Sequence, residues 1–419
     1  MSMNHEREVN LGPTLPGSEP PEWPSTLDVP MLVAEGWEPT PFREFVLKIH
    51  SRCDLACDYC YMYELADQTW RLRPRRMPPA IAEQTATRIA EHTHAHGLTR
   101  VTLILHGGEP LLAGPDLITH VVTSVRDTAG PRVQVDVSLQ TNGIGLDTEY
   151  LRLFDGLDIR VGVSLDGDAA AHDRHRRYRN GRGSHAAVVA ALERLAAGPY
   201  QHLFAGLLCT IDVHNDPVST YEALLQLNPP MIDLLLPHGT WTTPPPERIP
   251  GSPSTPYADW LIAVFDRWFD APRQETRIRL FEEIMHLLLG GASASEAVGL
   301  SPASMIVIET DGSIEQSDML KSAYHGAPWT GLHVARDPLD AALLLPSVVA
   351  RQIGAMALSN ECRRCRIRQV CGGGLYPHRY RSGSGFANPS VYCPDLFRLI
   401  THIRQAMMAG IAARLARRQ

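Results

Sequence analysis

Short apolar runs recur along the first half of the chain, and each is separated from the next by a longer stretch with helical periodicity. Residues 101–105 read Val-Thr-Leu-Ile-Leu, a continuous apolar run typical of a strand that is buried on both faces. Comparable runs predict strands at 45–49, 101–105, 133–139, 159–165, 203–211 and 231–236. Apolar residues spaced by three and four predict helices between them, at 79–96, 116–129, 147–155, 184–197 and 217–227.

Six strand-helix repeats of this kind predict an α/β protein with a parallel sheet. Right-handed crossovers place the helices on the outside and curve such a sheet. We therefore expect a partial (β/α)6 barrel over residues 43–240.

The remaining segments are organised differently. Residues 1–42 are rich in Pro, Gly, Ser and Glu, which predicts a flexible or wrapping N-terminal extension. Residues 241–300 begin with a Pro-rich stretch, a stiff linker or lid, and continue with bridging helices at 257–270 and 277–289. Residues 301–398 form a smaller region that opens with a strand pair at 305–309 and 313–316, and residues 399–419 complete a C-terminal helix.

Composition restricts the possible function classes. The 419 residues are 44% hydrophobic and 20% charged, with a net charge of -7, which disfavours a general nucleic-acid surface. Neither a membrane span nor a signal-peptide core is present in the sequence, so we expect no membrane partner and a cytoplasmic location. Thiols stay reduced there, so the eight cysteines, grouped as three, four and one, are expected to be metal ligands rather than disulfides.

The first cysteine group is compact. Cys53, Cys57 and Cys60 have CxxxCxxC spacing and directly follow the first predicted strand. Iron–sulfur clusters normally take four thiolates, so three in one loop leave one iron of a 4Fe-4S cluster open for another ligand. A zinc site is the alternative, with His50 as its fourth ligand, although zinc loops usually pair two CxxC or His motifs.

Polar motifs follow the next three strands as well. Gly107, Gly108 and Glu109 come after the second strand, Asn142 after the third and Asp166 after the fourth. In parallel α/β sheets ligands bind beyond the carboxyl ends of the strands, so four consecutive motifs there predict one shared site.

These motifs resemble those of the radical S-adenosylmethionine (SAM) enzymes. In that family SAM chelates the open iron, and one electron from the cluster cleaves its sulfonium to a 5′-deoxyadenosyl radical. Gly-Gly-Glu-Pro at 107–110 is similar to the element that receives the SAM amine. The resemblance implies SAM contacts from the following residues: Tyr59, Gly107, Gly108, Glu109, Ser138, Gln140, Asn142, Ser164 and Asp166.

Some of these residues have simpler explanations. Ser164 and Asp166 also suit the capping of the turn that follows their strand. The basic stretch at 172–179 is equally consistent with binding a carboxylate and with a solvated loop. Cys209 lies inside an apolar run, where a cysteine behaves as a small hydrophobe, so we expect it to be structural.

The second cysteine group is Cys362, Cys365, Cys371 and Cys393. Four cysteines are enough to bind either one zinc ion or one iron–sulfur cluster. Its spacing resembles the SPASM extension of radical SAM peptide maturases, which holds auxiliary iron–sulfur clusters. A full extension has seven cysteines for two clusters, but here Ser317 and Leu375 occupy two of those positions. The resemblance therefore implies one auxiliary 4Fe-4S cluster with four protein ligands, suited to electron transfer.

Within SPASM proteins, the segments at 309–316, 371–380 and 385–393 are most similar to cyclophane-forming maturases of the FxsB type. This similarity implies a C–C crosslink between an aromatic ring and a nearby β-carbon of a ribosomally made precursor peptide, with ferredoxin or flavodoxin as reductant. A base must take the ring proton, and His172, Asp173, Glu309 and Asp318 are the candidates. The alternatives are a thioether-forming or sulfatase-maturing SPASM enzyme, or a non-catalytic, zinc-stabilised binding protein.

Overall fold

The computed structural model describes residues 22–416, and its centre is one curved ten-stranded sheet with the order β10-β9-β8-β1-β2-β3-β4-β5-β6-β7. All six predicted strands of the barrel are confirmed and run parallel. Their bounds are β1 Glu44–His50, β2 Arg100–Gly107, β3 Gln134–Thr141, β4 Ile159–Ser164, β5 Phe204–Thr210 and β6 Met231–Leu235. The expected α/β fold with a parallel barrel sheet is therefore confirmed.

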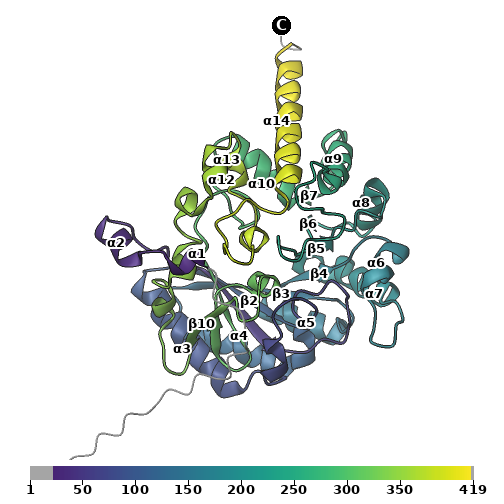
Figure 1. The fold of residues 1–419 in the computed structure, drawn as a ribbon. Helices are drawn as coiled ribbons and strands as arrows, with labels where there is room; N and C mark the ends of the chain where they lie inside the picture. The colour runs from purple at the N-terminus through teal and green to yellow at the C-terminus, as the bar shows by residue number, and fades with distance from the viewer. Residues whose placement is uncertain (1–21, 417–419) are drawn as a thin grey trace, which may run out of the picture.

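The predicted helices are also confirmed, and Figure 1 shows them on the outer side of the sheet. They are α3 Pro79–Ala95, α4 Pro115–Ala129, α5 Thr148–Leu157, α7 His185–Ala196 and α8 Pro217–Leu225, together with the short α6 Ala169–His175. Local sequence explains where several begin. Asp147 and Asp216 each accept a hydrogen bond from a backbone N–H of the first helical turn, and Pro occupies an early position of α3, α4 and α8.

The two faces of the sheet differ in polarity. Along β2 and β3, fully buried positions alternate with half-buried ones. Leu103, Leu105, Val137 and Leu139 belong to the core that packs under the helices. The alternate positions, which include Ser138 and Gln140, face the opposite, inner side, because side chains of a strand alternate between faces. The inner side is therefore the polar one.

Segments from the second half of the chain extend both edges of the sheet. The predicted strand pair is confirmed as β8 Met305–Ile308 and β9 Ser313–Glu315, and β8 pairs in parallel with β1. Trp329–His333 adds a further strand, β10, antiparallel to β9. At the other edge Arg277–Ile278 forms β7 beside β6. The cysteine-bearing region thus begins inside the barrel sheet, a connection that local sequence patterns did not predict.

The Pro-rich stretch is fixed to the C-terminal region. Arg248 is buried, donates to the carbonyl of Val391 at 2.9 Å and lies 3.4 Å from the carboxylate of Asp395. Trp241 N donates to Tyr380 O at 2.9 Å. The bridging helices follow as α9 Pro256–Phe269 and α10 Arg279–Leu288, as predicted. This part of the chain therefore behaves as a packed strap.

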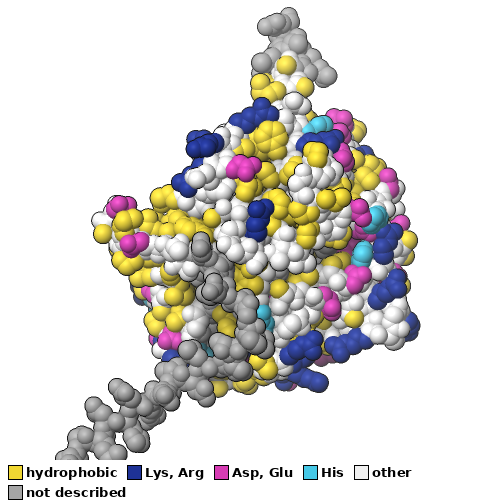
Figure 2. All heavy atoms as spheres, viewed as in Figure 1, with side chains coloured by type: hydrophobic (Ala, Val, Ile, Leu, Met, Phe, Trp, Pro, Cys, Tyr) yellow, Lys and Arg dark blue, Asp and Glu magenta, His cyan; other side chains and the backbone are white. Residues whose placement is uncertain are grey.

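The C-terminal region consists of short helices, including α12 Asn360–Arg364 and α13 Arg368–Cys371, and ends in α14 Cys393–Ala416. Figure 1 shows α14 projecting from the molecule, and Figure 2 shows apolar side chains along this projection, where Met408 and Ile411 are exposed. Across the described residues, no helix has both the length and the apolar character that a membrane span requires.

The N-terminal segment wraps this region. Glu22–Ser25 and Val29–Ala34 form α1 and α2. Val29 and Leu32 pack against Val349, Ile353 and Ala357 in one apolar cluster. Residues 1–21 of the predicted extension lie outside the described part of the chain.

Candidate functional site

The first three cysteines lie in the loop directly beyond the carboxyl end of β1. The N–H of Cys60 donates to the carbonyl of Cys57 at 3.2 Å, which closes a turn between these two ligand candidates. Ala56 N donates to Arg177 O at 2.8 Å and so ties the loop to the segment after β4. Cys53, like the other two, is a free and partly exposed thiol. All three are thus available at the mouth of the barrel.

The chemistry and spacing of these thiols fit an iron–sulfur cluster. Burial raises the pKa of Cys57 to about 11, and it also raises the pKa values of Cys53 and Cys60, so thiolates here require a bound cation. Among the described residues, no three cysteine sulfurs lie within 4.8 Å of one another. Thiolates around a single zinc ion lie closer together, at about 3.8 Å, because each Zn–S bond is about 2.3 Å long.

The two glycines after β2 allow the backbone to approach the cysteine loop closely. A Cβ on Gly107 would lie 2.2 Å from the carbonyl oxygen of His50. On Gly108 it would lie 1.8 Å from the hydroxyl of Tyr63 and 2.6 Å from Arg52 O. These distances exclude any larger side chain at either position without displacement of the loop. The Gly-Gly element therefore lies against the cysteine loop.

Glu109 joins the ends of two strands. Its buried carboxylate accepts hydrogen bonds from Thr141 Oγ1 at 2.7 Å, Asn142 N at 2.8 Å and Leu111 N at 3.0 Å. Burial raises its pKa to about 7. Asn142 in turn donates to Asp54 at 2.7 Å, within the cysteine loop. The Glu109 side chain thus connects the loop after β2 to the end of β3 and, through Asn142, to the cysteine loop.

Asp166 has a similar joining role after β4. It accepts hydrogen bonds from the Tyr59 hydroxyl, from Arg176 Nε at 2.9 Å and from Thr210 N at 2.9 Å. The guanidinium of Arg176 also lies 5.5 Å from the Tyr59 ring centroid. Part of the basic stretch is therefore buried against the site, while Arg174 pairs with Asp212 at the surface.

The remaining predicted SAM contacts lie on the inner face. Gln140 Nε2 donates to Ser164 Oγ at 3.1 Å, so polar side chains of β3 and β4 lie side by side on the inner face. Ser138, two positions before Gln140 in β3, lies on the same face. Gly162 leaves room for this pair, because a Cβ there would lie 2.3 Å from Gln140 Oε1. All nine predicted contacts lie in the second halves of the first four strands or in the loops that follow.

The four base candidates divide into two pairs. His172 is buried, with Nε2 2.9 Å from Ser184 Oγ and Nδ1 accepting from Asp166 N. Asp173 accepts from the N–H groups of Ser184 and His185 at 2.8 and 2.9 Å. Both side chains hold α6 against the start of α7.

Glu309 and Asp318 instead lie in a buried group of charges beside the cysteine loop. Lys321 donates to Glu309 at 2.9 Å and to Glu315 at 2.8 Å. Burial disfavours the charged form of Lys321, but the carboxylates of Glu309 and Glu315 raise its pKa overall. Asp318 pairs with Lys48 of β1. Burial opposes the charge of Asp318, yet Lys48 lowers its pKa overall and keeps it ionised.

The cations of this group were not among the residues predicted from the sequence. Lys48 is 1% exposed and stands beside His106 of β2, whose Nδ1 is 2.9 Å away. Burial and the Lys48 ammonium lower the pKa of His106 to about 4. A lysine inside the apolar run at 45–49 was the available signal, because an unpaired ammonium is not tolerated in a buried strand.

The second cysteine group forms one site. Cys362 lies on α12, Cys365 ends that helix, Cys371 ends α13 and Cys393 begins α14. Burial, together with the nearby thiols of Cys371, Cys362 and Cys365, raises the pKa of Cys393 to about 12. Cys209 is buried in β5.

A row of aromatic rings connects the two cysteine sites. Tyr61, next to Cys60, lies 4.7 Å from His238, measured between ring centroids. His238 lies 5.7 Å from His378, and His378 lies 5.0 Å from Tyr392, which precedes Cys393. The buried atoms His238 Nδ1 and His378 Nε2 have no hydrogen-bond partner among the described residues. The row thus places two ring nitrogens without a hydrogen-bond partner between the two cysteine sites.

Comparisons with known proteins agree with this geometry. The family model of the radical SAM superfamily matches residues 47–209, which span β1 to β5. A serine-type anaerobic sulfatase-maturating enzyme of Klebsiella aerogenes is 27% identical over 84% of this chain and 84% of its own. A cysteine-type enzyme of Clostridium novyi is 22% identical over 88% of this chain and 96% of its own.

Solved structures show the same fold. Native anSMEcpe with bound AdoMet and Cp18Cys peptide has a TM-score of 0.75 at 20% identity, covering 89% of this chain and 99% of that one. Streptococcus suis SuiB bound to its precursor peptide SuiA has a TM-score of 0.53 at 14% identity, covering 92% and 84%.

The family match, the three-cysteine loop and the cysteine-rich C-terminal region agree with one another. They contradict the alternative of a non-catalytic zinc-stabilised protein, and they agree with the predicted cofactors, which are SAM, a 4Fe-4S cluster and an auxiliary cluster. The chain is a radical SAM enzyme.

Proposed function

We propose that this enzyme forms a C–C crosslink in a ribosomally made precursor peptide, between an aromatic ring and the β-carbon of a nearby residue. The similarity to enzymes of peptide substrates supports the substrate class. The assignment of crosslink formation, rather than another peptide modification, rests on the auxiliary site. This site has four thiols, and Ser317 and Leu375 stand in place of two further cysteines. One auxiliary cluster suits a reaction that must pass on a single electron once the ring bond has formed.

Cys53, Cys57 and Cys60 would hold the SAM-binding cluster, and the Gly107 and Gly108 backbone would lie beside the cofactor. Cys362, Cys365, Cys371 and Cys393 would hold the auxiliary cluster. When bound, the first cluster and SAM supply a 5′-deoxyadenosyl radical that removes a hydrogen atom from the peptide. The chain's own residues must then orient the peptide and take the ring proton.

We assign the proton acceptor to Asp318. The oxygen Oδ1 of Asp318 is buried and has no hydrogen-bond partner among the described residues, while the Lys48 ammonium keeps the carboxylate ionised. A base needs an ionised group with a free lone pair, and Asp318 meets both conditions. His172 and Asp173 use their polar atoms to join helices.

The target side chain would lie against the ring row of Tyr61, His238 and His378. These rings stand between the two cysteine sites, and the unpartnered nitrogens of the two histidines can hydrogen-bond a peptide backbone. A reductant protein such as ferredoxin or flavodoxin would deliver electrons, as in the family that the sequence resembles.

Sulfatase-type maturation is the second candidate, because the full-length similarity is to sulfatase-maturating enzymes. Oxidation of a serine to formylglycine removes two hydrogens, as does each crosslink, so a mass change alone does not separate the two reactions. A test for an aldehyde separates them, because formylglycine reacts with a hydrazide probe and a crosslink does not. A thioether is distinguished by the loss of an alkylatable cysteine.

The test is to co-express the enzyme with small peptides encoded beside its gene, under anaerobic conditions. We expect a loss of two mass units per ring, no hydrazide adduct, and fragment ions that stay joined across an aromatic residue. A hydrazide adduct on the product would assign sulfatase-type maturation instead. The Cys57→Ala variant serves as the inactive control.

A further inference from the structure

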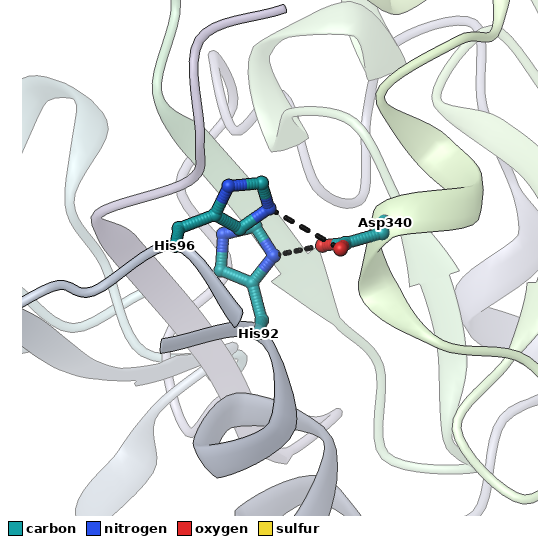
Figure 3. Close-up of side chains that lie close together, drawn as sticks. All are labelled: His92, His96 and Asp340. Carbon is teal, nitrogen blue, oxygen red and sulfur yellow. Dashed lines mark hydrogen bonds and ion pairs between the residues drawn. The ribbon is translucent and has the colours of Figure 1, made fainter. Parts of the chain in front are cut away.

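Two histidines and one aspartate converge far from the cysteine sites. His92 and His96 lie one helical turn apart at the end of α3, where His96 N donates to His92 O at 3.1 Å. Both rings face Asp340, which lies on the 3-10 helix η5 (Leu339–Ala342), as Figure 3 shows. His96 Nε2 is 3.2 Å from one carboxylate oxygen, and His92 Nδ1 contacts the other. All three ligand atoms lie within 4.8 Å of one another.

The tautomer of His92 is fixed by its second nitrogen. Nε2 lies 3.1 Å from the carbonyl oxygen of Phe42, which can only accept, so Nε2 carries the hydrogen. In neutral His92 the lone pair of Nδ1 therefore points at the carboxylate of Asp340. Metal-binding histidines commonly donate their other ring N–H to a backbone carbonyl in this way.

The group is buried on the side of His92 and open on the other side. The side chain of His92 is 0% exposed, and its ring packs 5.5 Å from Phe42 and 6.0 Å from Phe45, measured between centroids. The side chains of His96 and Asp340 are 26% and 41% exposed, so one side of the group is open to water.

We propose that His92, His96 and Asp340 bind a first-row divalent cation of the zinc class, with water completing its coordination. Two imidazoles and one carboxylate suit zinc, and histidines four residues apart on one helix face are a suitable pair of ligands. The ion would join α3 of the barrel to η5, two elements about 240 residues apart in the chain. The site therefore acts as a clamp between the barrel and the C-terminal region.

The test uses anaerobically reconstituted, cluster-loaded enzyme that has been treated with a chelator and then titrated with zinc. Bound zinc is counted by mass spectrometry, its ligands are identified by X-ray absorption at the zinc edge, and thermal unfolding is followed with and without zinc. The variants are His96→Ala and Asp340→Asn, which leave the buried His92 in place. The matched control is His202→Ala, which removes a lone exposed histidine 3.0 Å from Asp155.

We expect wild type and His202→Ala to bind one zinc with nitrogen and oxygen ligands at about 2.0 to 2.1 Å. Zinc should raise their unfolding temperature. The other two variants should bind at least about tenfold more weakly, since even the loss of a partner to a ligand costs that much. Equal binding by all variants, sulfur-only ligation or no zinc uptake by wild type would overturn the proposal and leave His92 and Asp340 as a simple ion pair.

Discussion

Individual buried side chains that carry a charge determine which acid and base groups the inner face of the barrel presents. Lys48 and Lys321 are each 1% exposed and are held by carboxylates of the segment that follows β8. Removal of one member of such a pair leaves a buried charge without compensation, at a cost of about 3–5 kcal/mol. Asp318 therefore has two roles that must be separated by experiment, as the partner of Lys48 and as the proposed base.

Asp318→Asn keeps the shape of the side chain and removes its basicity. We expect deoxyadenosine formation to persist while crosslinked peptide per deoxyadenosine falls by about a hundredfold or more, the usual contribution of a positioned base. Both products are measured in one anaerobic assay, and cluster content is checked by electron paramagnetic resonance. Glu91→Gln, at an exposed acid paired with Arg88, is the control. An unchanged product ratio in Asp318→Asn would exclude it as the base.

The carboxyl of Glu109 predicts a pH dependence. Its pKa is raised by burial from 4.5 to about 7 in the folded protein. The folded state therefore binds this proton more tightly than the unfolded chain, and the contribution of Glu109 to stability decreases as pH rises from about 4.5 to about 7. Glu109→Gln cannot ionise, so its stability relative to wild type should improve over this range, by up to about 3 kcal/mol.

Urea unfolding of both proteins at pH 5 and pH 8 measures this difference. The comparison cancels the titration of all groups that the two proteins share. A constant difference between wild type and Glu109→Gln at the two pH values would mean that Glu109 is ionised even at the lower pH.

At the scale of elements, the site depends on the close approach of two loops. A Cβ on Gly108 would lie 1.8 Å from the Tyr63 hydroxyl and 2.6 Å from Arg52 O, so Gly108→Ala must displace the loop after β2 from the cysteine loop. We expect weaker SAM binding, by about tenfold or more, measured by the change that SAM causes in the resonance signal of the reduced cluster. Gly156→Ala in α5, where nothing lies within 4 Å of the new Cβ, should bind SAM normally.

Most elements of the barrel were predictable because their signals are local. Continuous apolar runs gave the six parallel strands, and Asp147 and Asp216 mark helix starts in the sequence itself. The position of the motifs after the strands followed from the topology of parallel sheets. The pairing of β8 with β1 joins segments about 260 residues apart, and nothing in either strand alone specifies its neighbour.

The partners of the predicted site residues were less predictable. Glu109 and Asp166 were expected near SAM, but each carboxylate is engaged by three protein donors, which come from two segments for Glu109 and from three segments for Asp166. Such contacts depend on side-chain directions that a spacing argument does not supply. The ring row through His238 and His378 escaped detection for the same reason, since its members lie in four separate segments.

At the scale of the whole molecule, the Pro-rich strap connects the barrel to the auxiliary site. Arg248 is 3% exposed and bonds Val391 O, two residues before Cys393. We expect Arg248→Ala to reduce iron at the auxiliary site while the SAM-binding cluster is retained, measured as iron per chain and as two separate resonance signals. Arg398→Ala, at a half-exposed surface pair with Asp259, is the control. Equal iron content in wild type and Arg248→Ala would show that the strap does not support the auxiliary cluster.

The central claim is that Cys53, Cys57 and Cys60 hold a cluster with one iron left for SAM. Its most direct test is the formation of 5′-deoxyadenosine by reconstituted, dithionite-reduced enzyme supplied with SAM. We predict that wild type and the auxiliary-site variant Cys371→Ala form it and that Cys57→Ala does not. Equal formation by wild type and Cys57→Ala, or none by wild type even with its precursor peptide, would contradict the account.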